Sequence, residues 1–341
     1  MKILFFNSQH FEEIHFNEAL KSFKNLGLQI TYSKETLSAT TVVLATGHEA
    51  VISFVNDVLN RECIEGLKRI GTKAIFLRSA GFNHVDLKAA TEFEMPVYRV
   101  PAYSPEAVAE HAMTLLMTLN RKTHKAYNRV REMNFSLEGL VGFNLNGKYV
   151  GVVGVGKIGK AFARIAAGFG CKVLLHDAYP DQDFLKSFAS NVSIEFVNKQ
   201  DLLKKSDVIS FHCPLNEGTK YFLNQENIIN LKKNVFLINT SRGAVIQTQA
   251  LIDGLKTSHI GGAALDVYEF ESELFFADHS ADIIQDDVIA RLITFPNVLI
   301  TAHQGFLTDE ALTEIANTTF LNVQDFLQFG PNSKSEKRIR L

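Results

Sequence analysis

Three glycines, Gly154, Gly156 and Gly159, have the spacing G-x-G-x-x-G directly after an apolar run, Tyr149–Val153. An amphipathic helical pattern, Ile158–Ala167, follows them. In a strand–turn–helix of this kind, the first glycine allows a tight turn and the second lets the backbone approach a pyrophosphate. The third lets the helix pack closely on the strand, and the helix N-terminus offers N–H groups to the phosphates. The segment therefore predicts a dinucleotide site rather than only a glycine-rich turn.

An acid stands where the ribose of such a dinucleotide would lie. A second apolar run, Cys171–His176, ends at Asp177, about 20 residues after the glycines. Its carboxylate would bond the ribose hydroxyls and repel a 2′-phosphate, which favours NAD over NADP. The residues 177–181 also fit a plain turn, so this role is a hypothesis; comparable catalytic efficiency with NADPH and NADH would count against it.

Three polar segments each follow a predicted strand: Asn239–Gly243, Asp266–Glu271 and Thr301–Phe306. The planar fork of Arg242 matches a carboxylate, although an arginine can also bridge surface acids. His303 could donate a proton near neutral pH, although a lone histidine is more often structural. Because strands of a doubly wound sheet present their carboxyl ends to the ligand crevice, we expect these segments to share one site. They suit hydride transfer from a nicotinamide to a ketone that carries a carboxylate.

The elements that must position these residues alternate between strands and helices. Before residue 100, apolar runs predict strands, and 3.6-residue periodicity predicts helices at Phe16–Leu26, Arg61–Ile70 and Val85–Phe93. Such alternation implies parallel sheets covered on both faces. The predicted early strands are Ile3–Phe6, Gln29–Tyr32, Ala50–Val55, Lys73–Leu77 and Val97–Val100. The strands predicted after Cys171–His176 are Ile194–Val197, Val208–His212, Val235–Asn239, Ile260–Leu265 and Val298–Thr301.

A helix is predicted to begin at Pro105, with Ser104 as its N-cap, and to continue to about Lys125. Its Ala107–Leu119 part is apolar nearly all round. A helix of this kind is buried on more than one side. We therefore expect it to lie between domains, against another subunit, or both.

The order of the elements predicts two domains. The last long helix, Asp309–Phe329, follows the final strand of the nucleotide domain, so we expect it to return to the first domain. The expected domains are residues 1–100 with 304–341 for the substrate, and residues 101–303 for NAD. The fold class is therefore α/β, with two doubly wound parallel-sheet domains and a Rossmann domain inserted into a flavodoxin-like one. We expect the substrate in a cleft between them.

Composition excludes several classes of protein. The 341 residues carry a formal net charge of −2 and are 46% hydrophobic, an ordinary composition for a soluble protein. Only the tail Lys334–Arg340 is locally basic, which argues against nucleic acid, and no apolar run is long enough for a membrane span. The first residues predict a strand rather than a signal peptide. Three scattered cysteines, Cys63, Cys171 and Cys213, lack metal-ligand spacing and suggest reduced thiols in a cytoplasmic protein.

Beyond these patterns, the chain resembles the D-isomer-specific 2-hydroxyacid dehydrogenases over nearly its whole length, and among them the fermentative D-lactate dehydrogenases. The resemblance includes the glycine segment and the three polar segments described above. The further matching segments are Arg78–Asn83, Val100–His111, Leu274–Phe276, Ile284–Asp287 and His303–Thr308.

The resemblance implies catalytic roles for three residues. Arg242 would bind the substrate carboxylate and keto oxygen, and His303 would exchange a proton with that oxygen. Glu271 would pair with His303, although spacing alone does not favour it over Glu269. The residues implied to contact substrate are Ser79, Ala80 and Gly81 through backbone N–H groups, with Tyr103 and Phe306. The residues implied to bind the cofactor are Gly154, Gly156, Lys157, Ile158, Gly159, Asp177, Cys213, Pro214, Thr219, Thr240, Ser241 and Asp266.

The function that the resemblance implies is NAD-dependent reduction of pyruvate to D-lactate. One alternative keeps this chemistry with a larger 2-keto acid. Another, from a different class, is an NAD(H)-sensing binding protein, because some transcriptional corepressors resemble this family. The partners expected are a small 2-keto or 2-hydroxy acid and a second copy of the chain, in a homodimer or homotetramer, with no metal, nucleic acid or membrane.

Overall fold

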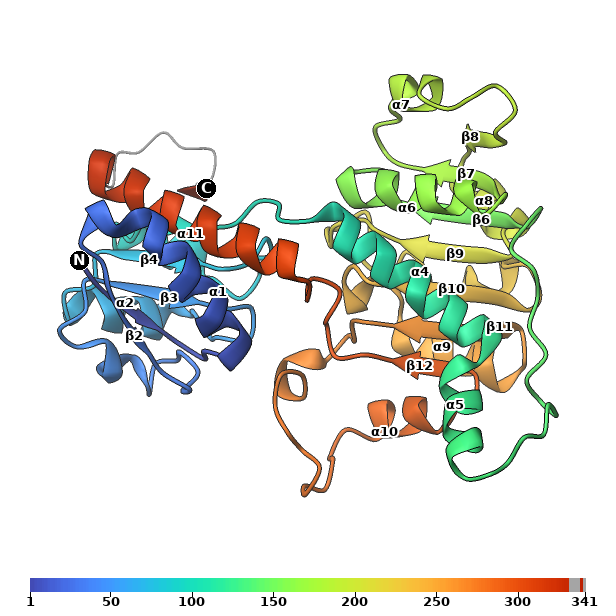
Figure 1. Ribbon diagram of the computed structural model, residues 1–341, viewed down its shortest axis with the longest axis horizontal. Helices are drawn as coiled ribbons and strands as arrows, with labels where there is room; N and C mark the ends of the chain where they lie inside the picture. The colour runs from blue at the N-terminus through green and yellow to red at the C-terminus, as the bar shows by residue number, and fades with distance from the viewer. Residues whose placement is uncertain (331–337, 340–341) are drawn as a thin grey trace. The chain divides into compact units, whose positions relative to one another are not determined.

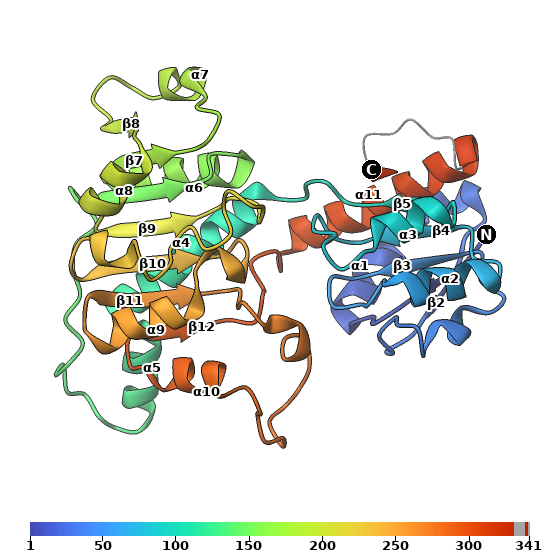
Figure 2. The same cartoon turned by 180° about the vertical axis from the view of Figure 1, so that it is seen from behind.

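The computed structural model describes residues 1–330 and 338–339. Its internal contacts divide the chain into two compact units. Unit 1 consists of Met1–Ser104 and the residues described from Leu307 onward, and unit 2 is Pro105–Phe306. Each unit has its own sheet with helices on both faces (Figures 1 and 2). The basic tail Lys334–Arg340 lies outside the described residues, except for its residues 338 and 339.

The sheet of unit 1 has six strands in the order β13-β5-β4-β3-β1-β2. Strands β1 to β5 are parallel, and their order is the flavodoxin-like one, as predicted. A two-residue edge strand, β13, is added antiparallel to β5. The strands are β1 (Lys2–Phe5), β2 (Gln29–Tyr32), β3 (Ala50–Ser53), β4 (Ala74–Leu77), β5 (Val97–Tyr98) and β13 (Arg338–Ile339).

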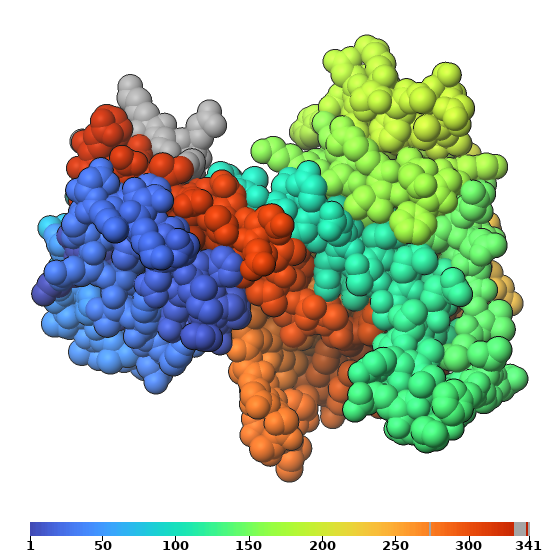
Figure 3. All heavy atoms as spheres, in the orientation of Figure 1, coloured from blue at the N-terminus to red at the C-terminus, as the bar shows by residue number. Residues whose placement is uncertain are grey.

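Alternate side chains of these strands pack on opposite layers of helices. Leu4 points into a core with α2 (Arg61–Arg69) and α3 (Leu87–Glu92). Its neighbour Phe5 contacts Phe16 of α1 on the other face, where α11 (Asp309–Phe329) also packs. Figure 3 shows α11 (red) lying along α1 (dark blue). Two 3-10 turns complete the unit, η1 (Lys21–Leu26) and η2 (Val42–Ala45).

The first helix differs from the predicted Phe16–Leu26. Helix α1 spans His10–Leu20, because Gln9 and Glu12 form a capping box that starts it six residues earlier. After Leu20 the chain tightens into η1, in which Phe23 leaves helical geometry. The prediction followed apolar spacing alone and missed the polar start signal.

The sheet of unit 2 has seven strands in the order β12-β11-β10-β9-β6-β7-β8, and all their pairings are parallel. Six of them reproduce the Rossmann order on either side of β6, which confirms the predicted fold class. The strands are β6 (Tyr149–Val153), β7 (Lys172–His176), β8 (Ile194–Phe196), β9 (Val208–Phe211), β10 (Val235–Asn239), β11 (Ile260–Leu265) and β12 (Val298–Ile300).

Two layers of helices cover this sheet. Val152 faces a core with α4 and α6, and the next residue, Val153, faces a second core with α8, α9 and α10. Within the described residues, no helix is both long and apolar enough to cross a bilayer. The helices are α4 (Pro105–Arg121), α5 (Thr123–Arg131), α6 (Lys157–Gly168), α7 (Gln182–Lys186), α8 (Lys199–Lys205), α9 (Thr248–Lys256) and α10 (Asp287–Thr294), with 3-10 turns η3 (Ile228–Asn230), η4 (Gly243–Val245) and η5 (Glu271–Glu273).

Helix α4 is shorter than predicted. It ends at Arg121 rather than near Lys125, because Lys122 adopts a left-handed backbone, φ 51°, and α5 begins after it. Its apolar side chains, including Leu116, pack against α6 and the sheet of unit 2. The helix is thus buried in the core of its own unit, and the expectation that it also lies against another domain or subunit stays a prediction.

Candidate active site

The three polar segments start from one edge of the sheet of unit 2. Strands β10, β11 and β12 are parallel neighbours, and Asn239, Leu265 and Ile300 lie opposite one another in the ladder. The chain leaves each strand just after these residues. Because the carboxyl ends of parallel strands share an edge, this register brings the segments containing Arg242 and His303 to the same part of the unit.

An imidazole and a carboxylate are paired at this edge. Nδ1 of His303 lies 2.8 Å from Oε1 of Glu271, and both side chains are about three-quarters buried. The other oxygen of Glu271 accepts the N–H of Tyr268 at 2.8 Å. A carboxylate at Nδ1 fixes the proton on that nitrogen. Nε2, which has no partner in the described part of the chain, is therefore the atom left to exchange a proton.

The structure distinguishes Glu271 from Glu269, which sequence spacing left open. Glu269 accepts hydrogen bonds from the Tyr221 hydroxyl at 2.5 Å and from Thr248 Oγ1 at 2.7 Å. Oε2 therefore holds the start of α9, and Oε1 is occupied by Tyr221. Glu271, and not Glu269, is the partner of His303.

Asp266 holds the backbone that carries this histidine. Its carboxylate is 1% exposed and accepts hydrogen bonds from Thr301 Oγ1 at 2.5 Å, Gln304 N at 2.9 Å and Gly305 N at 2.8 Å. His111 of α4 lies 3.1 Å away. Burial favours the neutral acid, but the hydrogen bonds to His111 and Thr301 outweigh it and lower the pKa of the Asp266 carboxyl group. These contacts make Asp266 an anion that fixes the 301–305 loop. Its place beside the cofactor, which the resemblance implies, stays a prediction.

Arg242 lies half-buried at the end of β10 with most of its guanidinium unused. Nη1 donates to the carbonyl of Ser241 at 2.7 Å, and no carboxylate of a described residue forms an ion pair with it. Among the described residues, therefore, Arg242 does not bridge surface acids. A side chain on Gly243 would overlap the backbone of Tyr268, so only glycine lets the two segments approach here.

The glycine segment has the geometry that a dinucleotide requires. Gly154 has φ 89°, and a Cβ there would lie 2.6 Å from the backbone nitrogen of Cys213. A Cβ on Gly159 would overlap the carbonyl oxygen of Gly154. Gly156 instead faces open space and is the N-cap of α6, with no side chain capping the helix. The first turn, which contains Lys157 and Ile158, thus leaves N–H groups for a pyrophosphate, so these residues fit NAD.

Asp177 lies beside this turn. Its Oδ2 accepts the N–H of Val155 at 2.6 Å, and its Oδ1 accepts that of Tyr179 at 2.8 Å. The carboxylate therefore lies at the ends of β6 and β7, next to the glycine segment, where a 2′-phosphate would meet its negative charge.

Gly159→Ala is expected to abolish NADH binding, because the new Cβ would push the helix off the glycine turn. NADH fluorescence titration of the purified variant measures this. Gly168→Ala, in the same helix but with open space around it, is the matched control and should bind normally, since alanine suits a helix better than glycine. Normal affinity in Gly159→Ala would contradict the assignment.

The remaining predicted cofactor residues lie at the ends of β9 and β10. Burial raises the pKa of the Cys213 thiol to about 11, so it is a packed, neutral group. Thr219 Oγ1 donates to the carbonyl of Pro214 at 2.5 Å and closes the loop after β9. Ser241 Oγ donates to Asn239 Oδ1 at 2.8 Å. The buried hydroxyl of Thr240 has no partner within residues 1–330 and 338–339, which leaves a polar atom that a ligand could satisfy.

The predicted substrate loop belongs to unit 1. Ser79 Oγ donates to the carbonyl of Gly81 at 2.8 Å, and Arg99 Nη1 donates to that of Ala80 at 3.0 Å. Tyr103 is half-buried near the end of the same unit, whereas Phe306 is the last residue of unit 2. In unit 2, His303 thus contacts both Glu271 and Asp266. The predicted substrate loop, residues 79–81, belongs to unit 1.

Comparisons with known proteins agree with this arrangement. Residues 113–305 match the family model described as "D-isomer specific 2-hydroxyacid dehydrogenase, NAD binding domain". 2-Hydroxyacid dehydrogenase A of Aspergillus oryzae is 50% identical over 96% of this chain and 92% of its own length. D-Lactate dehydrogenase of Escherichia coli is 47% identical over 95% and 96%, respectively.

Two solved structures share the fold of this chain over nearly its whole length. The apo form of D-lactate dehydrogenase from Escherichia coli has a TM-score of 0.88 and 43% identity, covering 99% of this chain and 100% of that one. The Aquifex aeolicus D-lactate dehydrogenase complexed with NAD and lactic acid has a TM-score of 0.84 and 31% identity, covering 99% and 98%.

The chain belongs to the D-isomer-specific 2-hydroxyacid dehydrogenase family. It is an NAD-dependent enzyme of that family.

Proposed function

We propose that the enzyme is a D-lactate dehydrogenase that reduces pyruvate with NADH. The observation that carries the proposal is the His303–Glu271 pair at the same sheet edge as Arg242, which provides a proton donor and a carboxylate-binding cation. The similarity to enzymes named D-lactate dehydrogenase supports the small substrate and the D product.

Each side chain has a defined task in this reaction. When bound, NADH supplies the hydride that reduces the keto carbon. Arg242 binds the substrate carboxylate with its fork, which sets the keto group at a fixed position. Nε2 of His303 donates the proton that the developing alkoxide needs, and Glu271 keeps the imidazole in the required tautomer and orientation. Oxidation of the hydroxy acid reverses both transfers.

Unit 1 is proposed to bind the substrate through Ser79, Ala80 and Gly81, with Tyr103 as a further contact. The N–H groups of Ala80 and Gly81 have no hydrogen-bond partner among the described residues, which leaves them to bind a carboxylate. On this proposal unit 1 is the substrate domain, and unit 2 is the NAD domain.

The test is a pyruvate and NADH assay of the pure protein, followed by chiral analysis of the product. D-Lactate as the product supports the proposal, and L-lactate or no turnover refutes it. The assay includes phenylpyruvate, 2-oxoisocaproate and hydroxypyruvate. A kcat/KM that is higher for one of these than for pyruvate would favour the larger-substrate alternative, and NADH binding without any turnover would favour a sensor.

Phe276 is expected to limit the size of the substrate. Its ring lies 5.8 Å from the His303 ring, centroid to centroid, on a backbone with φ 72°. Phe276→Ala should raise the ratio of kcat/KM for 2-oxoisocaproate to that for pyruvate by about tenfold, because pocket space for one or two methylenes has this effect. Phe275→Ala is the control, since Phe275 packs against the core of unit 2 and should change stability but not the ratio. An unchanged ratio in Phe276→Ala would remove this residue from the pocket.

A second copy of the chain is proposed to cover an apolar segment that follows α4. Between Tyr127 and Val141, six large apolar side chains are at least half exposed, although such groups are usually covered when they lie together. After α5 the segment contains no helix or strand, and it stands out from unit 2 (green in Figure 3). The side chains are Tyr127, Val130, Met133, Phe135, Leu137 and Val141.

A double variant, Leu137→Asp with Val141→Asp, should convert the proposed oligomer into monomers, because each new charge would have to be buried. Sedimentation velocity at micromolar concentration measures the mass. Ile283→Asp, at an equally exposed apolar residue outside the segment, should leave the mass unchanged. A monomeric wild type, or a double variant of unchanged mass, would refute this interface.

The cysteines support a reducing, cytoplasmic setting. Cys63, Cys171 and Cys213 are all free and buried, and burial raises the pKa of the Cys63 thiol to about 12. A protein whose thiols are not paired suits the cytoplasm, where reduction of pyruvate would regenerate NAD⁺ for fermentation.

A further inference from the structure

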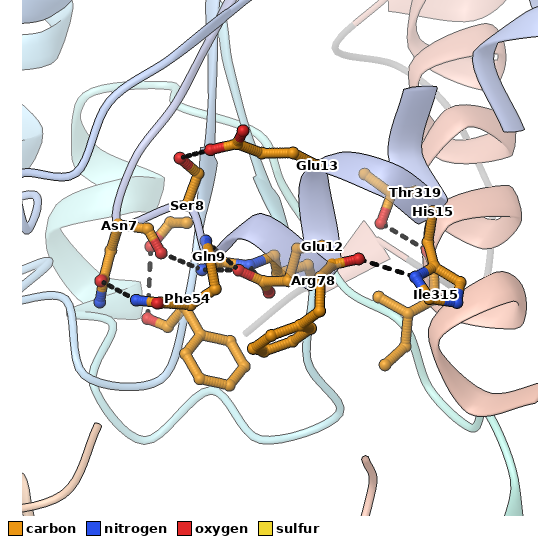
Figure 4. Close-up of polar contacts among 12 residues, drawn as sticks. Asn7, Ser8, Gln9, Glu12, Glu13, His15, Phe54, Arg78, Ile315 and Thr319 are labelled. Carbon is orange, nitrogen blue, oxygen red and sulfur yellow. Dashed lines mark hydrogen bonds and ion pairs between the residues drawn. The ribbon is translucent and has the colours of Figure 1, made fainter. Parts of the chain in front are cut away.

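A buried ion pair lies at the end of β4, directly before the proposed substrate loop. Arg78 is 1% exposed, and its Nε donates to Glu12 Oε1 at 2.6 Å, while Nη2 lies 3.2 Å from Glu12 Oε2. Nη2 also donates to the carbonyl of Asn7 at 2.9 Å. Figure 4 shows the guanidinium between these groups. The pair joins the first turn of α1 to the last residue before Ser79.

Stability alone does not explain this pair. The guanidinium lies 4.5 Å from the ring centroids of both Phe5 and Phe54, and its Nη1 is buried with no partner among the described residues. A buried charge with an unsatisfied donor is expensive, and apolar side chains of similar volume often serve a core as well or better. The free-energy cost of burying this charge indicates that the Arg78–Glu12 pair serves to hold neighbouring groups in place.

The pair fixes three loops that leave the same edge of the sheet of unit 1. Asn7 follows β1 and has a left-handed backbone, φ 50°, whose carbonyl is held by Arg78. Phe54 follows β3, and its ring lies 4.5 Å from the guanidinium, while the carbonyl of Ser53 accepts the backbone N–H of Arg78 at 3.0 Å. The strand order reverses between β1 and β3, which is where ligands bind in sheets of this kind.

In the loop after Arg78, residues 79–81, each backbone carbonyl accepts a hydrogen bond. Val100 N donates to the carbonyl of Ser79 at 3.1 Å, and Arg99 and Ser79 itself occupy those of Ala80 and Gly81. The N–H groups of Ala80 and Gly81 remain without partners in the described chain. A pair of N–H groups binds an anion well only if their direction is fixed before the anion arrives.

We propose that Arg78 and Glu12 are positioning residues for the keto acid: by fixing the end of β4 they set the direction of the 79–81 N–H groups that bind its carboxylate. The inference rests on the proposed function of that loop. It assigns this role to a pair of residues 66 positions apart in the sequence, neither of which touches the substrate.

The test replaces the pair as a unit, in the double variant Arg78→Met with Glu12→Met, in the full-length enzyme. The variant should fold and bind NADH normally, because two apolar side chains fill the site without a buried charge. Its thermal unfolding midpoint should fall by a few degrees, because Glu12 also accepts the N–H of Gln9 in the capping box of α1. KM for pyruvate should rise about tenfold to hundredfold, the effect of weakening one hydrogen bond to a charged group, while KM for NADH stays constant. The control is the double variant Glu13→Gln with Lys34→Met, which removes a more exposed ion pair of the same helix and should change neither constant.

A folded double variant with the wild-type KM for pyruvate would overturn the proposal. If the double variant does not fold, Glu12→Gln decides in its place, because it keeps the side-chain shape and one acceptor for Arg78 but removes the charge. A wild-type KM in Glu12→Gln would then overturn the proposal, and a raised KM with a normal KM for NADH would support it. A wild-type enzyme that reduces no 2-keto acid would instead refute the proposed function, so the two failures are distinct.

Discussion

His303→Asn is expected to lower kcat for pyruvate reduction by about two to four orders of magnitude while NADH still binds. This is the usual contribution of a positioned general acid. Asparagine cannot donate a proton to an alkoxide, but it tolerates the left-handed backbone of this position, φ 54°, as few other residues do. The variant therefore removes the chemistry and keeps the loop that Asp266 holds.

Stopped-flow measurement of a single turnover, with NADH titrated separately, separates the two effects. His279→Asn is the control: His279 also pairs with a carboxylate, Asp282, but in an exposed loop, and its loss should leave kcat unchanged. Turnover of His303→Asn within tenfold of wild type would exclude the histidine as the proton donor.

Arg242→Lys is expected to raise KM for pyruvate about tenfold to hundredfold, with KM for NADH unchanged. A lysine keeps the charge but replaces a planar fork with a single ammonium group, so one hydrogen bond to the carboxylate is lost. Turnover should also fall, because the keto group is no longer held at one orientation.

Steady-state kinetics at saturating NADH measures both constants. Arg164→Lys, on α6 of the same unit, provides the control, because its guanidinium lies over the Phe184 ring and carries no proposed role in the site. A KM for pyruvate equal to that of wild type in Arg242→Lys would show that another group binds the carboxylate.

The sequence predicted those parts of the molecule whose causes are local. Gly154 has the positive φ of a tight turn, and Gly159 is required by its contact with the carbonyl oxygen of Gly154 in the same turn. Their spacing therefore predicts the nucleotide fold. Parallel strands alternating with helices leave few topologies, and both observed sheets have the expected order.

The rest depends on contacts between distant residues. Glu269 and Glu271 are equivalent by spacing, and only the packing of Tyr221 and Thr248 against Glu269 separates them. The role of Asp266 depends on the loop after β12, and the Arg78–Glu12 pair joins different elements. The hydrophobic periodicity of the sequence does not predict such contacts between distant residues.

Local sequence signals also gave two wrong helix bounds, at the start of α1 and at the end of α4. Gln9 and Glu12 form a helix start that the prediction from apolar spacing missed. At Lys122, by contrast, nothing in the residue type predicts the left-handed backbone that separates α4 from α5. A lysine adopts that conformation only because the surrounding structure compensates for its cost.

The discontinuous make-up of unit 1 has a consequence for how the chain folds as it leaves the ribosome. Phe320 and Phe326 of α11 pack against Phe16, Phe76 and Tyr98, which are all made early. Unit 2 is one uninterrupted stretch and can fold as soon as it is synthesised. The earlier-made sheet must wait for α11 to cover its aromatic face, so a nascent chain arrested before residue 309 should present that face to chaperones.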